Sequence, residues 1–123
     1  MKLRSMILLL MIVSPITAWS KDWVLGEVSI VEDYTAFDPA QGILVTLTNK
    51  SYYVPSSPVA TVCTQRYRVA VGAEGVTADL AKNIYALLLM ARATGQRVRL
   101  FVNPDSNYGG GYCAVQIAGV GDV

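Results

Sequence analysis

The chain contains no histidine, and this absence removes several kinds of active site at once. Ser-His-Asp triads, Cys-His pairs and most zinc sites need an imidazole. Carboxylate pairs remain, but Glu32 and Asp33 are adjacent, so they would point to opposite faces of a strand and could not act together. We therefore predict a protein that is not an enzyme, with no catalytic residues, no metal site and no cofactor.

Charge is also scarce, and it is balanced. Ten Lys and Arg residues stand against nine Asp and Glu residues in a chain of 123 residues. A chain so close to neutral lacks the basic excess that binds nucleic-acid phosphates. We expect no nucleic-acid partner.

No apolar run reaches the roughly 20 residues that a membrane-spanning helix needs. The run from Met6 to Val13 is the one near the start of the chain, and it follows the positive residues Lys2 and Arg4. A short apolar run behind a positive start, broken by Pro15, is typical of an export signal.

Small residues follow this run, and they fit a cleavage site after Ala18 or after Ser20. We predict a signal peptide over residues 1–20 and one domain over residues 21–123, about 103 residues after cleavage (123 minus 20). The expected location is periplasmic or secreted, in a bacterium, with no stable membrane span after cleavage. An uncleaved anchor is the alternative.

Only two cysteines are present, Cys63 and Cys113, and they are not spaced as Cys-x-x-Cys. In an exported chain two such cysteines are expected to form a disulfide bond, and a redox role is not expected. The alternative is a pair of buried free thiols.

One long segment, Thr77 to Asn103, has a clear helical pattern that leads directly into a strand. Its apolar residues recur at the spacing of one helix face: Leu80, Ile84, Leu87, Leu88 and Ala91. Thr77 is placed to cap the helix, and Gly95 to end it. Arg97 to Val102 then alternates like a strand with one buried face.

Four further segments complete a set of five strands. The predicted strands lie within Val24–Tyr34, Gly42–Thr48, Arg66–Val71, Arg97–Val102 and Tyr112–Val120. Five strands with one helix between the third and the fourth is the element order of the OB-fold, a small Greek-key barrel. We predict a mainly β protein with this OB-fold-like barrel. The alternative is a small α+β sandwich with the helix on one face of the sheet.

Tyrosines gather near the two segments that we expect to be exposed loops, Asn49–Pro58 and Asn103–Gly111. A tyrosine offers a flat apolar face and a hydroxyl group, a combination used at binding surfaces. The candidate ligand-binding or glycan-binding residues are Tyr52, Tyr53, Asn107 and Tyr108. Anchoring of the loops is the alternative role for any one tyrosine.

The predicted helix carries a second apolar stripe, formed by Tyr85, Leu89 and Met90. One helix on a small barrel normally buries a single stripe, so this second one predicts a contact with another subunit. A wide core-facing stripe is the alternative.

Three stretches carry a resemblance to a known family: Asn83–Leu88, Ala93–Leu100 and Asn103-Pro104. They resemble the matching region of the B subunits of subtilase cytotoxin and of the pertussis-like and typhoid toxins. Leu25 to Ile30 is similar to the opening strand of that family. The resemblance implies an OB-fold, a homopentameric ring with helices around a pore, binding of sialylated or other host glycans, and an A-type toxin subunit as partner.

The chain also departs from that family. Leu25 stands where the glycan-binding members carry a serine, and Asp105–Gly111 replaces a loop that bears a tryptophan. The fold is therefore expected to carry over, and the sialic-acid site is not. Our leading hypothesis is an exported, non-enzymatic binding protein that resembles such a B subunit, binds a glycan and forms a ring. The alternative is a periplasmic OB-fold envelope or inhibitor-like protein with no toxin function.

Overall fold

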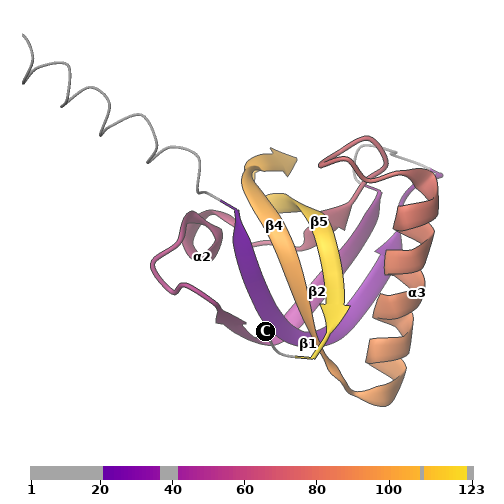
Figure 1. Cartoon of the computed structure of the whole chain (residues 1–123), viewed down its shortest axis with the longest axis horizontal. Coiled ribbons are helices and arrows are strands. Elements are labelled where there is room, and N and C mark those ends of the chain that lie inside the picture. Colours follow the sequence, from indigo (N-terminus) through magenta and orange to yellow (C-terminus); the bar gives the residue numbers. More distant parts are fainter. Residues whose placement is uncertain (1–20, 37–41, 109, 122–123) are drawn as a thin grey trace, which may run out of the picture.

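Five strands and two helices form the part of the chain that the computed structural model describes, residues 21–36, 42–108 and 110–121 (Figure 1). The elements are β1 Asp22–Asp33, β2 Ile43–Tyr52, α2 Pro58–Val62, β3 Tyr67–Val69, α3 Ala78–Thr94, β4 Arg97–Tyr108 and β5 Tyr112–Val120. The predicted signal peptide, residues 1–20, lies outside the described residues. Within them, no helix has the length and apolar character to cross a membrane.

The five strands close into a barrel in the order β1-β2-β3-β5-β4, with β4 pairing back onto β1. Every pair is antiparallel except β3 with β5, which run parallel. The predicted mainly β class with five strands is thereby confirmed. The order of the strands in the barrel differs from their order in the sequence, because the chain passes from β3 through α3 to β4, and β5 then lies between β3 and β4.

The joint between β3 and β5 is the shortest seam of the barrel, since it contains one register pair, Arg68 with Ala114. The predicted disulfide bond lies at this joint and is confirmed: Cys63 precedes β3, Cys113 lies in β5, and their Cα atoms are 5.5 Å apart. Both cysteines are completely buried. The bond therefore links two elements that share little backbone hydrogen bonding.

The helix α3 follows from local sequence signals, as predicted. The Thr77 hydroxyl accepts a hydrogen bond from the Leu80 N–H at 3.2 Å, and Gly95 ends the helix in the left-handed region. Its buried face consists of Ala81, Ile84, Leu88 and Ala91. Leu80 was expected on this face but is exposed in the first turn, where Ala81 faces the barrel instead.

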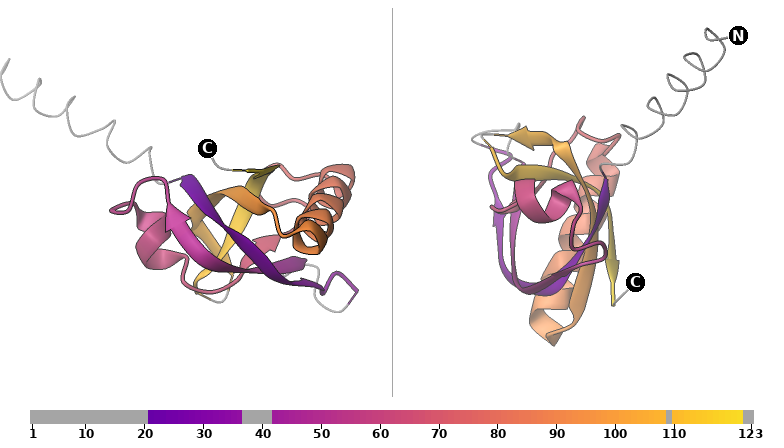
Figure 2. Two further views of the ribbon diagram at one scale, coloured as in Figure 1. Left: turned by 90° about the horizontal axis from the view of Figure 1, so that it is seen from below. Right: turned by 90° about the vertical axis from the view of Figure 1, so that its left-hand side faces the viewer.

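The core combines this helix face with the inward residues of every strand. Alternate strand residues point inward, as the pleat requires. The fully buried strand residues include Val24, Val45, Tyr67, Val69, Val98, Leu100, Val102 and Val115. Figures 1 and 2 show α3 along one side of the barrel and α2 on the opposite side.

The expectation of a single helix was wrong, because α2 forms a second one between β2 and β3. Its sequence, Pro-Val-Ala-Thr-Val, is rich in residues that favour strands. Pro58 at the first helical position and burial of Val59 against the barrel favour the helix instead. The third strand is correspondingly short.

Two strands run further than predicted, so the two expected loops are shorter. β2 continues through Asn49, whose φ of 51° bends the strand without ending it. β4 continues to Tyr108, with a register irregularity between Asn103 and Asn107 that accommodates Pro104.

Candidate functional site

A cavity of about 450 Å³ opens on the barrel surface where β1 begins, beside the segment that joins β2 to α2. We call it the aromatic groove. Its lining residues are Lys21, Asp22, Trp23, Tyr53, Val54, Ser57, Pro58 and Phe101. Mostly apolar walls with a few polar groups are typical of small-molecule sites, whose volumes run from about 300 to 1,000 Å³.

Trp23 and Phe101 form the aromatic wall of the groove. They are register partners on β1 and β4, so their side chains share a face, and their ring centroids lie 5.1 Å apart with the planes inclined by 53°. Their neighbours Val24 and Leu100 point into the core, which directs both rings outward.

Two further side chains flank this aromatic pair, one inside the groove and one outside it. The Tyr53 N–H donates to the Trp23 carbonyl oxygen at 3.2 Å, and its side chain, 62% exposed, lines the groove. On the other side Ile117 of β5 is the register partner of Phe101 and is also exposed. The result is an apolar row across the outer surface of the sheet.

Arg99 borders the row on one side. Its guanidinium carbon lies 5.7 Å from the Trp23 ring centroid. The position opposite Arg99 is Gly119, where a Cβ atom would meet the Arg99 Nε atom at 2.9 Å. A residue without a side chain at position 119 therefore leaves room for the guanidinium to lie along the sheet beside Trp23.

Two polar groups of the groove retain hydrogen-bonding capacity. Asp22 is 9% exposed, and its side-chain Oδ1 atom accepts a hydrogen bond from the Trp23 N–H at 2.8 Å. The Ser57 hydroxyl oxygen is buried and has no hydrogen-bond partner among the described atoms. The Asp22 carboxylate can accept further hydrogen bonds, so it is suited to contact a bound molecule, whereas the Ser57 hydroxyl oxygen is itself covered by protein atoms.

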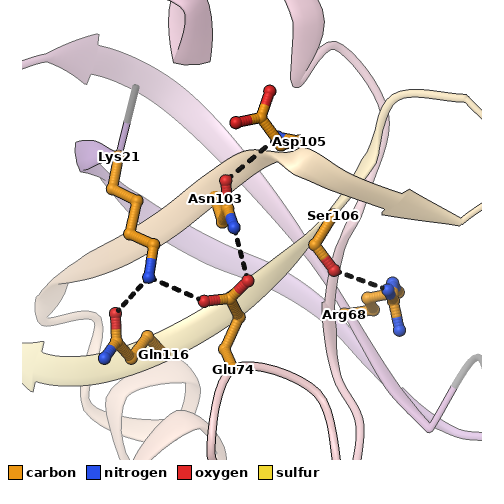
Figure 3. A network of polar contacts seen from close by, with 7 residues as sticks. All are labelled: Lys21, Arg68, Glu74, Asn103, Asp105, Ser106 and Gln116. Carbon is orange, nitrogen blue, oxygen red and sulfur yellow. Dashed lines mark hydrogen bonds and ion pairs between the residues drawn. The ribbon is translucent and has the colours of Figure 1, made fainter. Parts of the chain in front are cut away.

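Lys21 anchors the start of β1, and hence the groove, to the rest of the barrel (Figure 3). Its Nζ atom lies 3.0 Å from Glu74 Oε2 and 3.5 Å from Gln116 Oε1. Asn103 donates to the other oxygen of Glu74, and its own side-chain oxygen accepts from the Asp105 N–H at 3.0 Å. The network joins four segments that are distant in the sequence.

The carboxyl group of Glu74 is mostly buried within this network. Burial alone raises its pKa, but the hydrogen bonds from Asn103 and Lys21, together with the charges of Lys21 and Arg68, outweigh that effect. The pKa of Glu74 therefore lies below its ordinary value.

Of the four residues predicted to bind a ligand, the structure places Tyr53 in the groove. Tyr52 pairs with Val24 and packs half-buried against the core. Asn107 is absent from the groove lining, and its amide donates to the Pro104 carbonyl oxygen at 2.6 Å. Tyr108 ends β4 opposite Tyr112, and its side chain lies outside the described residues.

Sequence reasoning missed Trp23, Phe101 and Asp22. A signal for Phe101 was present, since the alternation that buries Leu100 and Val102 places Phe101 on the outer side. No local signal pairs Trp23 with Phe101, because that contact depends on the register of β1 against β4.

The outer face of α3 is the second surface of interest. Leu89 and Met90 are 40% and 49% exposed. Tyr85 differs from them, because it is partly buried against the core and lines a smaller cavity of about 230 Å³. These three residues were predicted as a subunit interface.

The described residues, which leave out 1–20, 37–41, 109 and 122–123, contain no group of three or more His, Cys, Asp or Glu side chains arranged to hold a metal ion. The described features define a small β-barrel with an aromatic surface groove. Comparisons of the chain with protein-family models, with curated proteins and with solved structures found no match.

Proposed function

We propose that this chain is an exported, non-enzymatic binding protein with an OB-fold, and that it recognises a glycan in the aromatic groove. The strand order, with α3 between β3 and β4, supports the OB-fold, whose members include oligosaccharide-binding domains. The buried disulfide bond supports an oxidising location outside the cytoplasm.

The observation that carries the glycan proposal is the combination of the Trp23, Phe101 and Tyr53 rings with the Asp22 carboxylate and the Tyr53 hydroxyl in one groove. Flat aromatic rings pack against the apolar faces of sugar rings. Hydroxyl groups of the sugar then need acceptors and donors, because buried polar groups without partners weaken binding. The groove offers both kinds of contact.

The experiment is a glycan array probed with the mature protein and with two variants. Tyr53→Ala removes an exposed side chain of the groove, and Ile30→Ala removes an exposed apolar side chain elsewhere on β1. We expect binding by the parent protein and by the Ile30 variant, and strongly reduced binding by the Tyr53 variant. Equal binding by all three proteins would refute the groove as the glycan site.

We further propose that the protein forms a ring of identical subunits, in keeping with its resemblance to toxin B subunits, and that an A-type subunit or a host glycan is its partner. The exposed Leu89 and Met90 support a contact between subunits along α3. A strict monomer in light scattering at micromolar concentration would refute the ring. A monomer that also binds no glycan would favour the alternative, a periplasmic protein with no toxin function.

A further inference from the structure

We propose that the aromatic groove selects a neutral sugar ring and discriminates against carboxylated sugars such as sialic or uronic acids. This inference rests on the proposed glycan function and specifies the chemical class of the ligand. It departs from the sialylated glycans that the resemblance to toxin B subunits implies.

The first argument is the carboxylate inside the groove. Asp22 is nine-tenths buried and lines the groove, where its Oδ1 atom accepts a hydrogen bond from the Trp23 N–H. An ionised carboxylate has only acceptor sites, so it matches ligand hydroxyl groups, which donate. Hydrogen bonds from neutral hydroxyls to a charged acceptor are stronger than those between neutral groups.

The second argument is the effect of the same carboxylate on an anionic ligand. A carboxylated sugar bound in the groove would bring a second negative charge close to Asp22. Like charges in a poorly hydrated site repel strongly and so disfavour that ligand. A neutral sugar of the same ring geometry has no such penalty.

The third argument concerns the cations that could offset this repulsion. Lys21 is the one cationic residue in the groove lining, and its ammonium group is already paired with Glu74. Arg99 is not part of the lining, and its guanidinium lies against the Trp23 ring and beside Gly119. Neither cation is therefore placed as a dedicated carboxylate site within the groove.

The walls agree with a neutral ring. Trp23 and Phe101 present two inclined aromatic surfaces, and Tyr53 adds a third with a hydroxyl group.

The test uses matched pairs of small sugars that differ only in the carboxylate. The probes are methyl β-glucoside with methyl β-glucuronide, and methyl β-galactoside with methyl β-galacturonide. Binding to the mature protein is followed by calorimetry and by the chemical shift of the Trp23 indole. We expect the neutral member of at least one pair to bind more tightly than its acid by about tenfold or more.

The variant Asp22→Asn adds a second readout. Asparagine keeps an oxygen for the Trp23 N–H, so the fold is retained, but the negative charge is lost. We expect neutral sugars to bind about tenfold more weakly, because a charged acceptor becomes a neutral one. The preference over the acid should shrink. Asp79→Asn, a matched change in the first turn of α3, should alter neither value.

The outcomes separate the two proposals. Tighter binding of the uronides, or of a sialoside, at the Trp23 indole would overturn the neutral-sugar inference and leave the glycan function standing. An unchanged preference in Asp22→Asn would remove Asp22 as its cause and overturn the inference in the same way. If no sugar of either kind binds, the glycan function and this inference fall together.

Discussion

Breaking the Cys63–Cys113 bond should destabilise the barrel more than loss of most single side chains. The bond joins residues separated by 50 positions in the sequence. Loop-closure entropy for a loop of this length corresponds to roughly 4 kcal/mol at 25 °C. Domains of this size have total stabilities of about 5 to 15 kcal/mol, so this is a large share.

The structure gives a second reason for a large effect. The seam that the bond closes, between β3 and β5, has one register pair, Arg68 with Ala114. Few backbone hydrogen bonds would remain there to hold the barrel closed after reduction. For a domain of about 100 residues the melting temperature should fall by roughly 15 to 30 °C, taking about 4 to 8 °C per kcal/mol.

The assay compares urea unfolding of the oxidised protein with that of protein reduced while unfolded and kept reduced on refolding. Reduction leaves no cavity, unlike substitution of the two buried cysteines. Reductant added to the folded protein should act slowly, because both cysteines are completely buried. A loss of stability below about 1 kcal/mol on reduction would refute the reasoning.

Three more predictions concern stability. Leu88→Ala should lower the free energy of unfolding in urea by about 2 to 5 kcal/mol, because Leu88 is fully buried. Leu89→Ala, on the exposed face of α3, should change the stability of the monomer by less than about 0.5 kcal/mol. Equal effects of the two substitutions would contradict the described orientation of α3. Gly42→Ala should strongly lower the melting temperature, because φ at Gly42 is +62° and a Cβ atom there would lie 2.3 Å from the Val69 carbonyl oxygen; an unchanged melting temperature would exclude this backbone geometry. The pKa of Glu74 is lowered in the folded protein, so its ionised carboxylate stabilises the fold above the ordinary pKa of 4.5, and this stabilisation is lost as the pH falls from 4.5 through the lower folded-state pKa. The urea midpoint should therefore fall less on acidification in Glu74→Gln than in the parent protein. An equal dependence of the two midpoints on pH would count against this network.

Much of the fold could be predicted because its signals are local. The helix period, the Thr77 cap and the Gly95 stop define α3 within the sequence itself. The alternation of inward and outward side chains predicts β5, and the bounds of this strand agree with the prediction. The cysteine pairing followed from the expected compartment and from there being only two cysteines.

The errors have a common physical origin, since tertiary contacts decided them. Val59 and Val62 favour a strand by composition, yet Pro58 and the burial of Val59 produce α2. Asn49 is a frequent turn residue, but β1 pairs with β2 on both sides of it, which keeps it in the strand. Such outcomes depend on partners that a local pattern does not contain.

The aromatic groove was less predictable than the fold. Tyrosine content near an expected loop predicted both Tyr53, which lines the groove, and Tyr52, whose strand position turns it toward the core. The aromatic wall needs Trp23 opposite Phe101, a pairing set by strand register. A glycan test that replaces both adjacent tyrosines would therefore mix a binding effect with a stability effect, and Tyr53→Ala alone is the better variant.

The most direct test of the central claim is a nuclear magnetic resonance titration of the protein over residues 21–123 with the best sugar from the array. The largest shift changes should map to the Trp23 indole and to the backbone amides of Tyr53 and Phe101, and they should saturate together. Changes centred on the Asn107–Tyr112 turn, or no saturable changes at all, would contradict the aromatic groove as the glycan site.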